Sequence, residues 1–163
     1  MILGQAANPD FAEHIRASFA RQAIMQLIGA ELGRVEPGFV EITLPYRSDL
    51  TQQHGYLHAG IVTTIADSAC GYAAFSLMPR DSEVLSIEFK VNLLSPAKGE
   101  SFLAKASVIK SGKTLTVVRG DVFSISEKDE KQLVATMQGT MMCLRGIKAR
   151  GDDPAERNQN RAG

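Results

Sequence analysis

The order of elements along the chain predicts an α+β fold in which one long helix packs against an antiparallel sheet. An apolar segment of helical length, at about 57–77, is followed by four segments that alternate between apolar and polar residues. Turn signals join these four segments directly, which is typical of consecutive antiparallel strands. Because the helix is apolar nearly all round, we expect the sheet to wrap it.

The residues before this helix predict a shorter helix and two strands. Asn8–Pro9–Asp10 is typical of a helix start, and large apolar residues then recur at helical spacing until Gly29, where we expect the helix to end. Pro37–Gly38 marks a turn between the two strands. In the second strand Val40, Ile42 and Leu44 alternate with polar residues.

After Pro79 the period changes from helical to two. Strands are predicted at 85–93, 102–108, 114–126 and 133–144, with turns between them. In the first of them Leu85, Ile87, Phe89, Val91 and Leu93 alternate with polar residues. We therefore divide the chain into an N-terminal segment and helix at 1–28, one domain at 29–147, and a polar tail at 148–163 that we expect to be disordered.

Composition excludes several classes of function. The 163 residues have a formal net charge of zero, so nothing favours nucleic acid as a partner. The two cysteines, Cys70 and Cys143, lie far apart, and we expect buried thiols rather than a disulfide or metal site. The first residues do not resemble a signal peptide, and polar residues dilute the stretch 58–77 too heavily for a membrane span, so we expect a cytoplasmic location.

Asp67 is the sharpest candidate for chemistry. Between Asp49 and Arg80 there is no other acidic residue and no Lys or Arg. A buried Asp is costly unless hydroxyl or backbone groups satisfy it, and Thr63 or Thr64 lies one turn earlier. Desolvation also makes a carboxylate a better base or nucleophile, so a structural and a catalytic role are about equally supported at this point.

Two other motifs give weaker evidence of function. Ser111–Gly112–Lys113 before Thr114 resembles the end of a phosphate-binding loop, but the required earlier glycine is Ser107 and a strand follows, so we expect a hairpin turn. His54 and His58 have the spacing of two metal ligands on a helix, yet they precede the helix. We expect no metal, and expect His58 to form a hydrogen bond near the helix start.

The helix start can also act as a donor. Small residues after His58 leave free N–H groups at the positive end of the helix dipole, where they can stabilise an oxyanion. Asp67 lies about two and a half turns further on, too far to reach the same substrate atom. A second copy of the chain would close that gap. Tyr56, Tyr72 and Phe75 are candidates for lining a pocket, although each also suits the core.

Three segments of the chain resemble the hotdog-fold acyl-CoA thioesterases of the phenylacetic-acid-degradation (PaaI-like) type. They are GYLHAGIVTTIAD, SIEFKVNLLSPAKGE and IKSGKTLTVVRGDVFS. The resemblance covers about residues 29–144. It implies a long helix wrapped by a curved sheet, and dimers joined edge to edge, often paired into tetramers, with active sites at the dimer interface. It implies hydrolysis of an acyl-CoA, and no cofactor beyond the CoA of the substrate.

The resemblance also implies roles for particular residues. Asp67 would be the base or nucleophile, and Ala59 and Gly60 would supply the oxyanion donor. Ser86 would assist from the neighbouring subunit, and Ser111, Gly112 and Lys113 would receive the nucleotide end of CoA. Two departures matter: the usual His-Gly-Gly is His58–Ala59–Gly60 here, and the usual Asn is Gln52, a role that Gln53 could take instead.

Two other functions stay open on the same fold. A hydratase or dehydratase would pair the helix carboxylate with a catalytic histidine, and only His14, His54 and His58 exist. A non-catalytic acyl-CoA-binding module would bind without turnover. The sequence leaves aryl and medium-chain acyl groups equally open.

Overall fold

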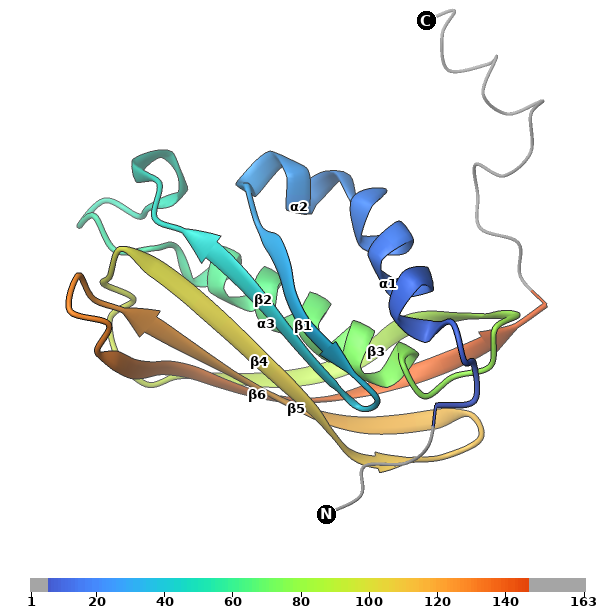
Figure 1. Cartoon of the computed structure of the whole chain (residues 1–163). Coiled ribbons are helices and arrows are strands. Elements are labelled where there is room, and N and C mark those ends of the chain that lie inside the picture. The colour runs from blue at the N-terminus through green and yellow to red at the C-terminus, as the bar shows by residue number, and fades with distance from the viewer. Residues whose placement is uncertain (1–5, 147–163) are drawn as a thin grey trace, which may run out of the picture.

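Six strands form one antiparallel sheet, and a single long helix lies along its concave face (Figure 1). The computed structural model of the protein describes residues 6–146. The α+β prediction is confirmed. In chain order the elements are α1 (Phe11–Ala20), α2 (Ala23–Ile28), β1 (Glu31–Glu36), β2 (Phe39–Pro45), a short 3-10 turn (Ser48–Leu50), α3 (Ala59–Phe75), β3 (Ser82–Leu93), β4 (Ser101–Ser111), β5 (Leu115–Ile125) and β6 (Lys131–Arg145).

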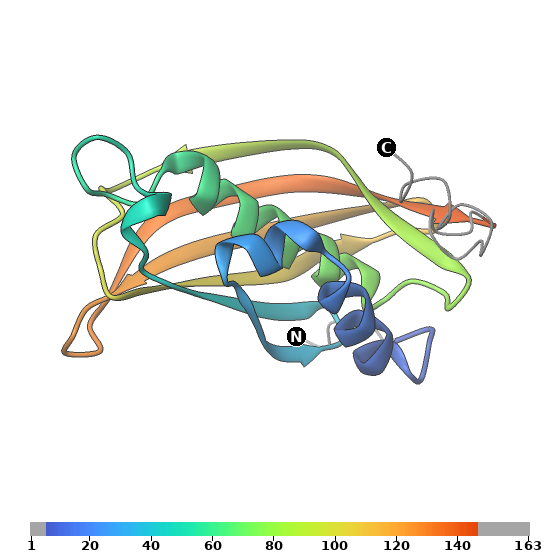
Figure 2. The same cartoon turned by 90° about the horizontal axis from the view of Figure 1, so that it is seen from above.

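The sheet has the order β1-β2-β4-β5-β6-β3, so β1 and β3 are its two edges. Seen from above, α3 lies between the edge strand β3 and the pair α1 and α2 (Figure 2). The helices α1 and α2 therefore cover one flank of α3. Among the described residues, only the edge strand β3 lies along the other flank. Within residues 6–146, no helix has the length and apolar character needed to cross a membrane.

Small residues of the sheet let α3 approach it closely. Ala104 and Ala106 of β4 are buried on the inner face, and Gly120 of β5 lies directly under the helix. A Cβ at Gly120 would stand 2.8 Å from the Cys70 Sγ atom, closer than van der Waals contact allows. Burial raises the pKa of the Cys70 thiol to about 12, so this side chain serves as a small apolar group. Cys143, in contrast to the prediction, is only half-buried.

The predicted N-terminal helix is in fact two helices. Gln22 adopts an extended backbone conformation, with φ −79° and ψ 95°, and separates α1 from α2. The break lets Ile15 of α1 and Met25 and Ile28 of α2 all reach the same buried core. Gly29 ends α2 as expected, in the left-handed conformation with φ 76° that glycine tolerates.

A β-bulge interrupts the alternation of β3. Ser86 pairs with Met141 and Glu88 with Thr140, so Ile87 is an extra residue on this strand. Uninterrupted alternation would place Leu85 and Phe89 on one face. The bulge instead turns Ser86 and Phe89 toward α3, because paired residues share a face and their partners Met141 and Gly139 are buried. Leu85 then points toward the outer face.

The predicted tail at 148–163 lies outside the described residues, as does residue 147. The division at residue 28 stays a prediction.

Substitution of Gly120 by Ala should destabilise the fold. The added methyl group would collide with the Cys70 Sγ atom, and we expect the free energy of unfolding to fall by about 1–3 kcal/mol in urea denaturation. In a Cys70→Ala background the same substitution should cost clearly less, because the clashing sulfur is gone. An equal loss in both backgrounds would contradict this account of how α3 contacts the sheet.

Candidate active site

Asp67 and Ser86 form the central pair of the site. Asp67 is a half-buried residue of α3, and the Ser86 Oγ atom on β3 donates a hydrogen bond to its Oδ1 atom at 2.8 Å. The same hydroxyl lies 3.2 Å from the Met141 sulfur. The resemblance implied that Ser86 acts toward a neighbouring subunit, whereas the structure places it on the carboxylate of its own chain. This contact holds one of the two carboxylate oxygens in place.

The threonines do not satisfy Asp67. Thr63 Oγ1 donates to the Ala59 carbonyl at 2.8 Å, and Thr64 Oγ1 donates to the Gly60 carbonyl at 2.7 Å. Such bonds to the preceding turn are common for threonine in helices. Within residues 6–146, the side chain that donates a hydrogen bond to the Asp67 carboxylate is therefore Ser86, and not a threonine of the preceding turn.

His58 caps α3, as expected from the sequence. Its Nδ1 atom accepts a hydrogen bond from the Gly60 N–H at 2.9 Å, and its carbonyl accepts from Ile61 and Val62. In the first turn of α3, the Ala59 N–H has no hydrogen-bond partner within the described part of the chain. Of the two predicted oxyanion donors, Ala59 is thus available, and Gly60 is engaged with His58.

A groove of about 490 Å³ opens beside this free N–H group. Gln52, Tyr56 and Ala59 line it, and so does the segment 93–97, which joins the end of β3 to the next turn. The Gln52 side-chain oxygen accepts from the His54 N–H, which leaves the Gln52 amide NH₂ as a possible donor into the groove. Gln53 is exposed and is not among the lining residues. The sequence did not indicate the apolar contribution of Leu93, Leu94 and Ala97 to this groove.

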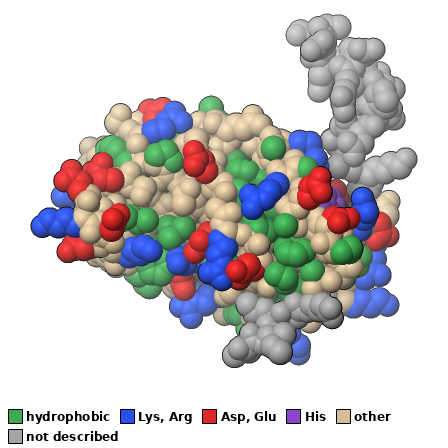
Figure 3. Space-filling view, in the orientation of Figure 1, with side chains coloured by type: hydrophobic (Ala, Val, Ile, Leu, Met, Phe, Trp, Pro, Cys, Tyr) green, Lys and Arg blue, Asp and Glu red, His purple; other side chains and the backbone are tan. Residues whose placement is uncertain are grey.

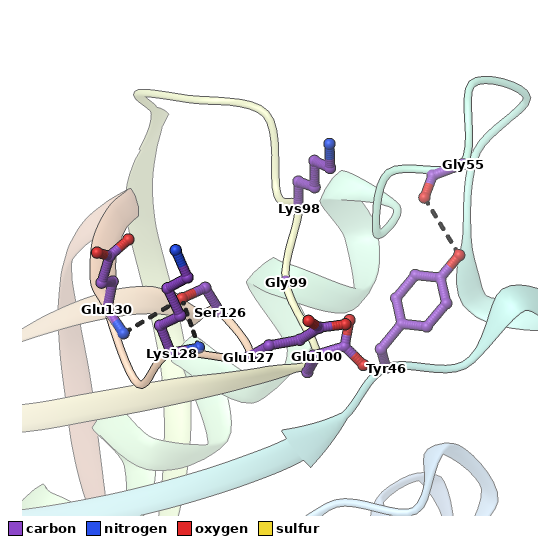
Figure 4. Close-up of a pocket in the computed structure, with 9 residues that line it drawn as sticks. All are labelled: Tyr46, Gly55, Lys98, Gly99, Glu100, Ser126, Glu127, Lys128 and Glu130. Carbon is purple, nitrogen blue, oxygen red and sulfur yellow. Dashed lines mark hydrogen bonds between the residues drawn. The ribbon is translucent and has the colours of Figure 1, made fainter.

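A second pocket, of about 560 Å³, is lined by Tyr46, Gly55 and the segment 98–100, together with residues of the turn between β5 and β6 (Figure 4). Tyr46 Oη donates to the Gly55 carbonyl at 3.4 Å, and Ser126 Oγ accepts from the N–H groups of Lys128 and Glu130. Two lysines and three glutamates line this pocket. Their charges are mixed, as they are over the face seen in Figure 3, so the pocket favours neither an anion nor a cation.

The remaining predicted residues lie elsewhere. The turn Ser111–Gly112–Lys113 joins β4 to β5 near the Gly38 turn, because the Val108 N–H donates to the Gly38 carbonyl. The start of α3 lies at the opposite end of β4, where the Leu57 N–H donates to the Ala97 carbonyl. Within one chain, the structure therefore separates this turn from Gln52, Tyr56 and Ala59.

The other candidate side chains have structural contacts. Tyr72 Oη lies 3.3 Å from Ser18 Oγ, and burial raises the pKa of Tyr72. The Phe75 ring lies 5.0 Å from the ring of His14. Both aromatic residues thus pack α3 against the N-terminal helices.

Comparison with known proteins gives the family. The model of the thioesterase superfamily matches residues 54–131, which include Asp67 and Ser86. A solved thioesterase family protein from Silicibacter pomeroyi is 51% identical, with a TM-score of 0.82, over 83% of this chain and 99% of its own. This chain belongs to the thioesterase superfamily. The predicted hotdog fold and thioester hydrolase class are thereby confirmed.

Other similar proteins are more distant. A provisionally named esterase from Saccharolobus solfataricus is 33% identical over 60% of this chain and 65% of its own length, so the match spans just under two thirds of that relative. The 1,4-dihydroxy-2-naphthoyl-CoA hydrolase of Listeria monocytogenes is 28% identical over 68% of this chain and 87% of its own. The PaaI protein from the phenylacetic acid degradation operon of E. coli shares the fold, with 19% identity and a TM-score of 0.74 over 87% of this chain and 99% of its own.

The cap at His58 should contribute measurably to stability. His58→Ala removes the acceptor of the Gly60 N–H, so we expect the free energy of unfolding to fall by about 1 kcal/mol in urea denaturation. His58→Asn keeps a capping acceptor and should lose only part of this. If both variants lose the same amount, the imidazole does not act as the cap.

Proposed function

We propose that this protein is an acyl-CoA thioesterase that hydrolyses an acyl-CoA to the free acid and CoA. The observation that carries the proposal is the make-up of α3: one helix presents an unpartnered N–H group at its start and a half-buried carboxylate held by Ser86 in its middle. Family membership and the named hydrolase of Listeria support the same reaction.

In this mechanism the Ala59 N–H, at the positive end of the α3 dipole, holds the thioester oxygen and stabilises the negative charge that develops on it. Asp67 accepts a proton from water as the water oxygen attacks the carbonyl carbon. The carbon–sulfur bond then breaks, and the proton passes to the departing CoA sulfur. Alternatively, the carboxylate itself attacks, and water hydrolyses the resulting anhydride. Ser86 positions the carboxylate in either route.

A complete site needs a second copy of the chain. Asp67 follows Ala59 by eight residues, which corresponds to about 12 Å along a helix, too far for both to contact one carbonyl group. In the proposed dimer, the carboxylate of one copy would meet the helix start of the other. The turn Ser111–Gly112–Lys113, at the far end of the sheet, would then serve the site of the other copy and hold the nucleotide end of CoA.

The two edges of the sheet indicate where the copies join. The edge strand β1 is short and carries Glu31, Arg34 and Glu36, charges that discourage pairing. The edge strand β3 has twelve residues and exposes large apolar side chains: Leu85 is 50% exposed, Phe89 43% and Leu93 56%. We propose pairing through β3, as a dimer or a pair of dimers. The cytoplasmic location stays a prediction.

Loss of the carboxylate should abolish turnover without unfolding the protein. We expect Asp67→Asn and Asp67→Ala to lower kcat/KM by at least about 100-fold, measured as thiol release from a panel of aryl and aliphatic acyl-CoAs. Asp121→Asn is a matched control, because Asp121 is also half-buried and accepts a hydroxyl hydrogen bond, from Thr136 at 2.6 Å, but lies on β5.

Unchanged activity in either Asp67 variant would refute the mechanism, and loss of folding would favour a structural role for Asp67. Tight binding of acyl-CoA by the native protein without thiol release would favour a binding module. Addition of water to an enoyl-CoA would favour the hydratase.

Mixing two inactive variants should restore activity if the site is shared. Ala59→Pro removes the donor at the first helical position, where proline fits the backbone, and Asp67→Asn removes the base. Co-refolding equal amounts should recover about one quarter of native activity, because half of the dimers are mixed and each holds one intact site.

No recovery from demonstrably mixed dimers would mean that Ala59 and Asp67 act within one chain. Ala59→Gly, which keeps the N–H, is the control and should stay active alone.

A further inference from the structure

Gly71 leaves an open space one helical turn beyond Asp67. The two residues are four apart on α3 and therefore lie on the same face of the helix. Gly71 is buried, yet a Cβ atom built on it would meet no atom within 4 Å apart from the helix's own backbone and the chain neighbours. The space that a side chain would occupy is thus open.

Packing within the subunit does not require a glycine here. Gly120 and Gly139 are close to their neighbours, since a Cβ would lie 2.8 Å from the Cys70 sulfur and 3.1 Å from the Phe89 Cβ atom respectively. Glycine is among the least favourable residues in a helix interior, and alanine would fit at position 71. Glycine makes the helix less stable here than alanine would. Since packing within the subunit does not require glycine, we infer that a group from outside the subunit occupies the space.

The surroundings of Gly71 suit an apolar group attached to a reacting carbonyl. Every residue of α3 from 68 to 75 is buried, whereas Gly60 is exposed and Thr63 and Thr64 are half-buried. The end of the helix beyond Asp67 is therefore the enclosed end, and the start is the open one. An apolar chain gains most from the enclosed end, and the polar CoA arm suits the open end.

We propose that Gly71 determines the size of the acyl group that the enzyme accepts. This inference rests on the proposed thioesterase function. One helical turn is about 5.4 Å, so a chain that runs from a carbonyl carbon at Asp67 reaches Gly71 with about its fourth or fifth atom. The hydrogen of Gly71 leaves room for medium-chain or aryl acyl groups there, and acyl groups of two or three carbons end before it.

The test is a comparison of acyl-group selectivity. Gly71→Ala and Gly71→Val would be assayed by thiol release from acetyl-, propionyl-, hexanoyl-, octanoyl- and phenylacetyl-CoA. We expect Gly71→Val to lower kcat/KM at least about 10-fold for the three larger substrates and to stay within about 3-fold of native for the two smaller ones. Gly71→Ala should show the same order with a smaller effect, and remains informative if the valine variant does not fold.

A matched control adds volume on the other side of the carboxylate. Thr64→Ile lies toward the helix start on the same face of α3 and should not change the ratio between large and small acyl groups. Oligomeric mass would be measured for every variant by light scattering.

The outcomes separate this inference from the proposed function. An active native enzyme with an unchanged selectivity ratio in both Gly71 variants would overturn the role of Gly71 alone. An equal loss for all substrates together with a lower oligomeric mass would also overturn it, because Gly71 would then pack against a second copy. If the native protein releases no thiol from any substrate, the proposed function fails first.

Discussion

The packing of α3 against the concave face of the sheet is the interaction on which the rest of the structure depends. This helix is too apolar to lie on a surface, and small residues on the inner face of the sheet, among them Ala104, Ala106 and Gly120, let it approach closely. Because Gly120 and Cys70 meet at the contact, helix and sheet have little freedom to slide past each other. A helix held in this way is a rigid support for chemistry.

The same packing decides where a ligand can bind. The sheet covers α3 from below, and α1 and α2 cover one flank, so the flank beside β3 is where Asp67 meets Ser86. The helix holds its free N–H at Ala59 and its carboxylate at Asp67 at a constant spacing. Chemistry that needs both groups at one atom must therefore use two helices, and the long apolar edge of β3 offers a way to bring a second one alongside.

Most of the fold could be predicted from local patterns. Alternation of apolar and polar residues at 102–108 predicted β4, and an apolar segment of helical length with one isolated carboxylate predicted α3 and Asp67. The break at Gln22 could not be predicted, because glutamine is a good helix former and the break depends on contacts with the core. Nor could the sequence show that Gly60 is bonded to His58 and Ala59 is not, since this depends on the rotamer of the cap.

The bulge at Ile87 has a consequence for how β3 can change. In a regular strand, removing or adding one residue moves every later side chain to the opposite face of the sheet. Here the extra residue divides the strand into two halves with independent orientation: one presents Ser86 to the carboxylate, and the other presents Phe89 and Leu93 along the same flank. Deleting Ile87 would leave Ser86 and Phe89 two residues apart, so a regular strand would still turn both toward α3, whereas a strand that kept Ile87 without the bulge could turn only one of them inward.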